Sequence, residues 1–300
     1  QLAINFFQLR VLDSQRQLLE TTVAAYQKSL ELTRNRYNAG VAARAEVVLA
    51  ETQLRSTQAQ LIDVGVQRAQ LEHAIAILIG KPPAEFSLAA AALAVAVPVL
   101  PPGLPSELLE RRPDIAAAER QMAAANAQIG VAQAAYFPSL TLSGVFGFRA
   151  NSPPSWLTSP SRLWSVGPAL AETLFDGGSR RAVKKQAEAA YDANVATYRQ
   201  TVLNAFKEVE DNLSALHILE EEAKTQEEAV KASRLSTELT VNQYKAGTVN
   251  YLNVVTVQAT QLSNEAIAVK LHGQRLVAAV TLVQALGGGW NGLSANSASR

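Results

Sequence analysis

The residues of this sequence that could do chemistry are three histidines and one pair of glycines. His73, His217 and His272 could bind a metal or transfer protons, but each stands alone, without a second ligand at helical spacing. Residues 175–178, Phe-Asp-Gly-Gly, precede a helical segment as a phosphate-binding loop would, but no Gly-Lys-Ser/Thr follows them. We therefore predict that the protein is not an enzyme and has no metal site and no cofactor. The histidines are expected on the surface or between helices, and the glycines at a bend between a strand and a helix.

Charge and composition narrow the class of protein. The formal net charge is +1, so no nucleic acid is expected as a partner. The basic run Arg180, Arg181, Lys184 and Lys185 is predicted to be a solvated helix face. Hydrophobic residues make up 48% of the chain but aromatic residues only 6%, and the apolar residues are mostly Ala, Leu and Val. This balance favours long helices packed side by side over a thick globular core.

A stretch near the start of the chain returns two-thirds of the way along it. Residues 31–48 and 238–255, which are 207 positions apart, are identical at nine of eighteen positions. In each copy a Tyr-x-Ala-Gly sequence, ending at Gly40 or Gly247, falls where one helical pattern ends and the next begins. We infer an internal duplication built around two helical hairpins. The identical pairs are Glu31/Glu238, Leu32/Leu239, Thr33/Thr240, Asn35/Asn242, Tyr37/Tyr244, Ala39/Ala246, Gly40/Gly247, Val47/Val254 and Val48/Val255.

Helical periodicity and its breaks divide the chain into six segments. A first helical hairpin is expected over 1–80, an Ala/Pro-rich connector over 81–104, a single helix over 105–137, a β-hairpin over 138–175, a second and longer helical hairpin over 176–286, and a tail over 287–300. Pro113 is expected to begin a new helical segment within the single helix. No helix that spans a membrane is expected. Because the chain opens inside a helical pattern and without Met, we interpret it as a fragment that lacks its natural N-terminus.

Two segments of about ten residues alternate between apolar and small or polar residues, so the period changes from 3.6 to 2. A strand of a membrane β-barrel has this pattern, although a half-buried hairpin of a soluble sheet has it too. The next helical pattern runs for nearly seventy residues without Pro or Gly, and a helix of that length must lie against others like it, which favours the membrane interpretation. The predicted lipid-facing residues are Leu140, Leu142, Phe146, Phe148, Trp164, Val166 and Leu170, and the predicted lumen-facing residues are Ser139, Thr141, Ser143 and Ser165.

Two strands cannot close a barrel, and an open strand edge is not tolerated in lipid. By the duplication, a counterpart of the β-hairpin is expected before residue 1, which gives four strands to a complete protomer. Four strands are still fewer than the roughly eight that a membrane barrel needs. The protein is therefore predicted to be a homo-oligomer whose copies share one barrel.

Three motifs resemble the outer-membrane efflux protein family, most closely its TolC-like, NodT-type channels of resistance-nodulation-division pumps. The motifs are RRPDIAAAERQMAAANAQIGVAQAAYFPSLTLSG at 111–144, LFDGG at 174–178 and GQRLVAAVTLVQALGGGW at 273–290. The resemblance implies a mainly α fold with a membrane β-hairpin, assembled as a homotrimer. Its twelve-stranded transmembrane β-barrel would lie in the outer membrane of a Gram-negative bacterium, and its long α-helical hairpins would form an α-barrel in the periplasm. Two of the four strands of each protomer fall in this sequence, and lipid attachment, which is common in this subfamily, would fall outside it.

The resemblance also implies a function and partners. The protein would be the passive outer-membrane exit duct of a tripartite efflux system that expels drugs or other small molecules. Its partners would be a periplasmic membrane-fusion adaptor protein, an inner-membrane pump that it meets only indirectly, and outer-membrane lipid. An outer-membrane duct of type I protein secretion is an alternative of the same class. A soluble coiled-coil scaffold or adaptor is an alternative of a different class, and it does not account for the alternating strands.

The two Tyr-x-Ala-Gly turns are the candidate functional site. From the residues alone, each is a helix C-cap in which Gly adopts a positive φ and Tyr packs on the turn. The resemblance implies that both turns lie at the periplasmic tip, where they form the aperture and meet the adaptor. Asn253 and Thr256 stand where related channels often carry an acidic ring, so we expect closure by packing and neutral hydrogen bonds rather than by ion pairs. The site residues are Tyr37, Gly40, Val41, Glu46, Tyr244, Gly247, Thr248, Asn253 and Thr256.

Overall fold

A computed structural model describes residues 1–93, 95–98, 112–151, 153–155 and 157–288. It is mostly helical with one small sheet, which confirms a mainly α fold with a β-hairpin. The chain divides into two compact units. The first comprises Gln1–Leu104 and Lys207–Gly289, and the second comprises Pro105–Phe206 and Trp290–Arg300.

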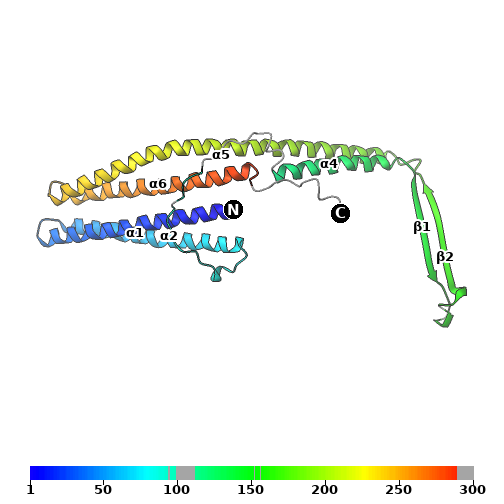
Figure 1. Cartoon of the computed structure of the whole chain (residues 1–300), viewed down its shortest axis with the longest axis horizontal. Helices are drawn as coiled ribbons and strands as arrows, with labels where there is room; N and C mark the ends of the chain where they lie inside the picture. Colours follow the sequence, from blue (N-terminus) through cyan, green and yellow to red (C-terminus); the bar gives the residue numbers. More distant parts are fainter. Residues whose placement is uncertain (94, 99–111, 152, 156, 289–300) are drawn as a thin grey trace. The chain divides into compact units, whose positions relative to one another are not determined.

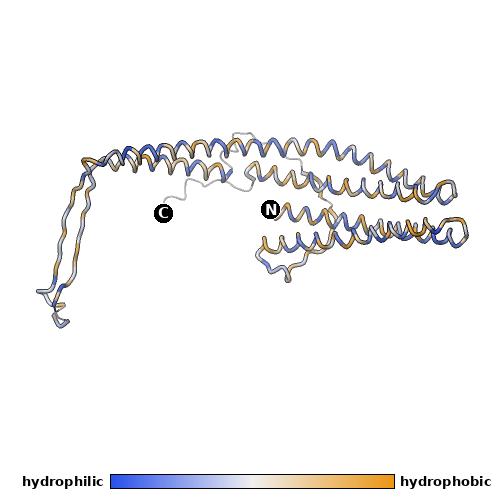
Figure 2. The backbone as a smooth tube through the Cα atoms, turned by 180° about the vertical axis from the view of Figure 1, so that it is seen from behind, coloured by the Kyte–Doolittle hydropathy of each residue, from blue (hydrophilic) through white to orange (hydrophobic). Residues whose placement is uncertain are grey.

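The first unit begins with a helical hairpin, α1 (Leu2–Asn38) and α2 (Arg44–Leu78), shown in Figure 1. Neither Pro nor Gly interrupts α1, and its apolar residues recur at helical spacing, so Leu9, Leu12 and Leu19 are all buried. Hydrophilic and hydrophobic residues alternate along the helices (Figure 2). The apolar stripe of α1 therefore packs against both α2 and α6, and these contacts hold the helices of the first unit together.

The second hairpin is formed by α5 (Ser179–Lys245) and α6 (Tyr251–Ala285). At 1.5 Å per residue, the 67 residues of α5 span about 100 Å. In the first unit α6 lies so close to α1 that a Cβ at Gly273 would come within 2.2 Å of Val11 Cγ2. Contrary to expectation, α6 is apolar and long enough to cross a membrane by length and composition, alone among the described helices. Core helices share this composition, and α6 buries Leu276 and Leu282 within the first unit.

A connector follows α2 and begins with a short 3₁₀ turn, Pro83–Glu85. Residues 86–93 then run without regular structure and are held through their backbone by polar side chains of α1 and α2. The rest of the predicted connector, at residue 94 and at 99–104, lies outside the described residues. The contacts are Leu88 N–H to Glu72, Arg68 Nη2 to Leu88 O (2.5 Å), Ala91 N–H to Asp13 Oδ2 (3.1 Å), and Leu93 N–H to Ser14 Oγ (2.9 Å).

The second unit contains α4 (Pro113–Ala134), which covers the later part of the helix predicted over 105–137. Residues 105–111 lie outside the described part of the chain, and Arg112 is extended, with φ −90° and ψ 122°. The ring of Pro113 forces this conformation on Arg112, while Pro113 itself suits the first position of a helix. The predicted helix start at 105 lies outside the described residues, the chain is not helical at Arg112, and a new segment begins at Pro113 as expected.

The sheet of the second unit has two antiparallel strands, β1 (Ser139–Phe148) and β2 (Arg162–Ala171). The strand register places Leu140 opposite Leu170 and Phe146 opposite Trp164. Because side chains alternate along a strand, this register gathers the aromatic residues and most of the large aliphatic residues of both strands on one face, although Val145 and Leu163 lie on the other.

A bend joins the strand β2 to the helix α5. Gly177 and Gly178 have φ of +62° and +91°, so they supply the backbone freedom that was predicted for them. The backbone N–H and guanidinium of Arg180 and the N–H of Gly178 donate to Asp176 and lower its pKa to about 2. Asp176 therefore stays ionised at neutral pH, and these hydrogen bonds weaken only as the pH falls from about 4 toward 2.

Candidate functional site at the hairpin turns

The two hairpin turns have the same backbone. Gly40 and Gly247 have φ of +76° and +78°, and the N–H of the following residue donates back across the turn in each case. Val41 N–H donates to Arg36 O at 2.9 Å, and Thr248 N–H donates to Gln243 O at 3.0 Å. This is the Schellman motif, so the predicted glycine C-cap is confirmed at both positions.

Gly40→Ala should destabilise the protein by about 1–2 kcal/mol, because an L-residue is strained at this positive φ. A Cβ at position 40 would meet no atom within 4 Å, so the cost comes from the backbone alone. Gly65→Ala is the matched control: it lies inside α2, also has open space, and should stabilise the protein by about 0.5–1 kcal/mol. Thermal unfolding followed by circular dichroism measures both shifts, and shifts of the same sign would contradict the prediction.

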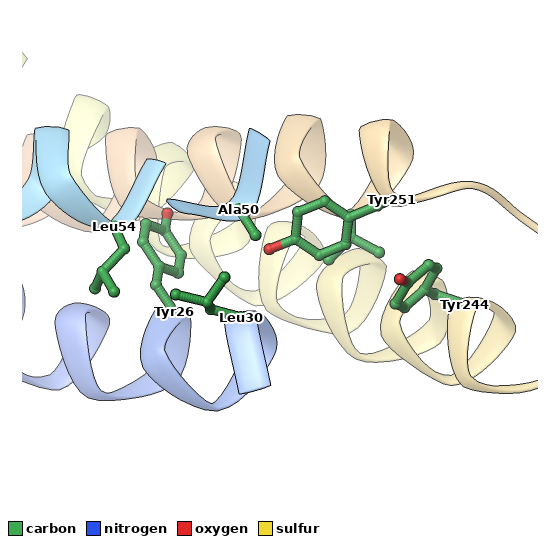
Figure 3. Packing of buried hydrophobic residues seen from close by; sticks show 7 residues of the cluster. Tyr26, Leu30, Ala50, Leu54, Tyr244 and Tyr251 are labelled. Atoms are coloured by element: carbon green, nitrogen blue, oxygen red, sulfur yellow. The ribbon is translucent and has the colours of Figure 1, made fainter. Parts of the chain in front are cut away.

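A cluster of buried residues from α1, α2, α5 and α6 lies near the turns. Figure 3 shows its packing from close by. Three tyrosines dominate it, and each comes from a different helix. Their rings bury a large apolar area, and a buried tyrosine hydroxyl usually needs a hydrogen-bond partner. The residues of this tip cluster are Tyr26 and Leu30 from α1, Ala50 and Leu54 from α2, Tyr244 from α5, and Tyr251 and Val254 from α6.

Tyr244 joins the second hairpin to the first. Its ring is 1% exposed and contacts Tyr251 edge to face, with ring centroids 5.3 Å apart. Its hydroxyl lies 3.1 Å from Glu46 Oε2 and 3.4 Å from Thr33 Oγ1. The predicted site residues Tyr244 and Glu46 are thus in direct contact, although they are 198 positions apart in the sequence.

Burial makes these tyrosine hydroxyls harder to ionise. It is the largest cause of the raised pKa of Tyr244 and of the pKa of Tyr251, which rises to about 12. The carboxylate of Glu46 also raises the pKa of Tyr244. At neutral pH the Tyr244 hydroxyl is therefore a hydrogen-bond donor, and its bond to an ionised carboxylate is stronger than a bond between neutral groups.

Arg36 completes the contact from the first hairpin. Its guanidinium stacks 4.5 Å from the centroid of the Tyr244 ring and donates to the backbone carbonyl of Tyr244. It also donates to Lys245 O at 3.3 Å. These carbonyls lie at the C-terminal end of α5, where they lack partners within the helix and attract positive charge. The first hairpin thus caps the second.

Tyr37, the counterpart of Tyr244, does not make the equivalent contact. Its side chain is 43% exposed, so the expectation that Tyr packs on the turn is correct for Tyr244 and wrong for Tyr37. The backbones of the two turns are alike. The difference therefore comes from what lies beside each turn: within one chain, only the second turn has a neighbouring hairpin on the side of its tyrosine.

The other predicted site residues lie on the surface of the two turns. The side chain of Val41 is 66% exposed. Thr248 Oγ1 donates to Gln243 O, and Thr256 Oγ1 donates to Leu252 O, each at 3.0 Å. Asn253 is exposed, and its backbone N–H donates to the side chain of Asn250, which caps α6. None of these four residues belongs to the tip cluster, so they are free to meet a partner.

The strand residues also keep the pattern predicted for them. Apolar side chains lie opposite one another and are highly exposed, with Leu142 at 74% and Trp164 at 72%. On the other face, Ser139 Oγ and Ser143 Oγ donate across the pair to Ala171 O and Gly167 O at 3.4 Å.

Two functional contacts were not anticipated from the sequence. Arg36 was not predicted as a site residue because the duplication identifies only positions that are identical in both copies, and the counterpart of Arg36 is Gln243. Tyr251 was missed for the same reason, because its counterpart is Arg44.

Of the histidines, His272 Nε2 lies 3.0 Å from Val95 O, and within the described residues no group of three His, Cys, Asp or Glu could hold a metal ion.

Long antiparallel helical hairpins joined to a β-hairpin form the fold of outer-membrane channels. The known structure of the outer-membrane channel OprN superimposes with a TM-score of 0.88 and 34% identity, over 96% of this chain and 65% of OprN. The structure of VceC from Vibrio cholerae gives 0.83 and 28%, over 96% of this chain and 69% of VceC.

Sequence comparisons agree with this class. The chain matches the model of the outer membrane efflux protein family over residues 1–81 and 104–288, and it belongs to that family. The outer membrane protein OprJ of Pseudomonas aeruginosa is 42% identical over 190 residues, which are 63% of this chain and 40% of OprJ. The solvent efflux pump outer membrane protein SrpC of Pseudomonas putida is 32% identical over 290 residues, which are 96% of this chain and 62% of SrpC. The chain thus spans less than two-thirds of the length of these relatives.

Proposed function

We propose that this protein is a passive exit duct in the outer membrane, through which an efflux system expels small molecules. Three copies would share one twelve-stranded barrel, and their helical hairpins would form a second barrel in the periplasm. The observation that carries the proposal is the β-hairpin, whose one face is apolar and exposed while the other carries hydroxyl groups. Such a sheet fits lipid on one side and a water-filled lumen on the other.

The assignment of faces follows from the strand register. Leu140, Leu142, Phe146, Phe148, Trp164, Val166 and Leu170 would contact lipid, and Ser139, Thr141, Ser143 and Ser165 would line the lumen. Relatives named as components of efflux pumps, such as SrpC, favour the export of small molecules over the secretion of proteins.

The hairpin turns would form the periplasmic end of the duct. Gly40, Val41, Gly247 and Thr248 would meet a membrane-fusion adaptor, which connects the duct to an inner-membrane pump. Tyr37, Asn253 and Thr256 would surround the aperture, while Tyr244 and Glu46, which bond to each other, would support the turns from behind it. Energy would come from the pump, since the duct itself only provides a passage.

Native mass spectrometry and single-channel recording test this function together. The intact protein extracted in detergent should have the mass of three chains, and it should produce discrete current steps in planar bilayers. A water-soluble single chain that needs no detergent for extraction would instead support a coiled-coil scaffold.

Closed-state conductance should follow the bulk conductivity of the salt solution and show no further dependence on ionic strength. Salt screens exposed ion pairs, whereas Asn253 and Thr256 are neutral and give salt little to screen at the aperture. The measurement is single-channel conductance between about 0.1 and 1 M salt, a range over which the screening length falls from about 10 to 3 Å. Thr256→Glu is the control, since it adds a ring of carboxylates and should introduce a steep salt response. A steep response in the unmodified protein would contradict the prediction.

A further inference from the structure

Residues that are identical in the two copies of the repeat differ in their surroundings. Tyr244 is 1% exposed, whereas its counterpart Tyr37 is 43% exposed. Val255 packs against the tip cluster, whereas Val48 is 55% exposed. The third pair is reversed: Leu32 packs against the tip cluster, whereas Leu239 is 54% exposed. One chain therefore leaves two uncovered surfaces, one on each hairpin, and each carries residues that are covered in the other copy.

The contacts of the buried Tyr244 show which residues a partner must offer to cover the exposed Tyr37. Tyr244 of the second hairpin contacts three residues of the first, Thr33, Arg36 and Glu46. At the repeat offset of 207, their counterparts on the second hairpin are Thr240, Gln243 and Asn253. Gln243 and Asn253 are exposed and Thr240 is half-buried, so a second set of contact residues is present and accessible.

This second set has the chemistry to receive Tyr37. Thr240 repeats the hydroxyl of Thr33. The Asn253 side-chain carbonyl can accept from a tyrosine hydroxyl, as the Glu46 carboxylate does, and the Gln243 amide can donate to a helix-end carbonyl, as Arg36 does. Hydrogen-bonding roles are thus retained at all three positions, while both charges are lost.

We propose that Tyr37 of one chain docks between Thr240, Gln243 and Asn253 of a second copy of the same chain. Val48 of the first copy and Leu239 of the second would be covered at the same interface. This inference rests on the proposed function, because it specifies how neighbouring copies meet in the ring of hairpins. The contact runs head to tail, so the same step repeats from copy to copy until the ring closes.

The two kinds of contact in such a ring differ in strength. The contact within a chain includes a carboxylate and a guanidinium, whereas the contact between chains uses only neutral groups. Hydrogen bonds to ionised groups are about twice as strong as those between neutral groups. The ring would therefore separate between chains rather than within them when the aperture widens.

Photo-crosslinking tests the position of Tyr37 directly. The protein with p-benzoyl-phenylalanine in place of Tyr37 is irradiated in outer membranes, and the crosslinked peptides are identified by mass spectrometry. We expect a crosslink to residues 237–257 of a second copy. The same replacement at Asn38, an exposed neighbour on a different side of the helix end, should give a much lower yield of that product. A crosslink from position 37 to a different protein, or within its own chain, would overturn the proposal.

Adding a carboxylate at position 253 tests whether the hydrogen bond of Tyr37 contributes to the stability of the oligomer. Asn253→Glu gives the second hairpin the carboxylate of the first and should lengthen the lifetime of the oligomer in warm detergent by about fivefold. The gain should disappear when Tyr37→Phe is added, since no hydroxyl remains to donate. Repulsion between the new carboxylates is present in both backgrounds, so the comparison isolates the hydroxyl.

The outcomes separate this inference from the proposed function. A trimer that conducts ions but gives no crosslink between copies from position 37, or an equal gain from Asn253→Glu with Tyr or Phe at position 37, overturns the inference alone. A single chain that neither assembles nor conducts overturns both.

Discussion

Asp13→Asn is expected to lower the melting temperature of the helical part by roughly 5–10 °C. The Asp13 side chain is 2% exposed, and its two oxygens accept from Arg68 Nε at 2.8 Å and from Arg10 Nη1 at 2.9 Å. The Asp13 Oδ2 atom also accepts from the backbone N–H of Ala91 in the connector. The neutral amide keeps the size of the side chain but leaves the Arg10 guanidinium without its carboxylate, and Arg68 keeps only Glu72, at 2.9 Å, as an ion-pair partner.

The size of this effect follows from burial. The side chains of Arg10 and Arg68 are only 15% and 14% exposed, so water cannot replace the lost carboxylate. Breaking a buried ion pair by removing one partner typically costs about 3–5 kcal/mol, and the cost here should be smaller, about 2–3 kcal/mol, because Arg68 keeps Glu72 as a partner. In a domain of this size, 1 kcal/mol corresponds to a shift of about 2–4 °C. Release of the connector should accompany the loss, because Arg68 also donates to Leu88 O.

Two measurements check this prediction. Thermal unfolding gives the shift, and limited proteolysis shows whether residues 86–93 become easier to cut. Glu20→Gln is the matched control on the same helix: its pair with Arg16 is about half exposed, and removing it should cost at most about 1 kcal/mol. Similar shifts for Asp13→Asn and Glu20→Gln would show that the buried cluster contributes no more than a surface pair.

The helices and strands were predictable because their signals are local. Apolar residues at helical spacing, Gly40 and Gly247 at the breaks, and the period of two in 139–149 each depend on neighbours in the sequence. The start of α4 at Pro113 was predictable for the same reason, because proline suits the first position of a helix and the residue before it favours an extended backbone. The ring of that proline, rather than the apolar pattern, determines where the helix begins.

The contacts between distant segments could not be predicted in the same way. Asp13 and Arg68 are 55 positions apart, and nothing in either helix alone indicates that they pair. The tyrosines of the two turns are a clearer case, because both stand in a Tyr-x-Ala-Gly turn of the same backbone while their burial differs. Local sequence determines the turn, and the neighbouring hairpin determines whether the tyrosine is covered. An exposed residue whose duplicate is buried is therefore a sign of a partner outside the single chain.

Leu142→Arg is expected to reduce the amount of assembled channel in the outer membrane at least tenfold. In the proposed barrel Leu142 faces lipid near the middle of β1, and it is 74% exposed in the single chain. A lipid-facing arginine near the bilayer midplane costs about 2–4 kcal/mol, and three copies would each contribute one. Each 1.4 kcal/mol corresponds to a factor of ten in an equilibrium constant, so even one copy accounts for the expected loss.

Thr141→Arg is the matched control, since the two positions are adjacent and at the same depth. Thr141 pairs with Ala169 on the opposite face of the sheet, where a charged side chain would reach the water of the lumen. This variant should assemble normally and change only the conductance or the ion selectivity. The amount of oligomer in purified outer membranes, compared with the total expressed protein, measures assembly for both variants. Equal assembly of both, or a greater loss for Thr141→Arg, would mean that the apolar face of this hairpin does not meet lipid.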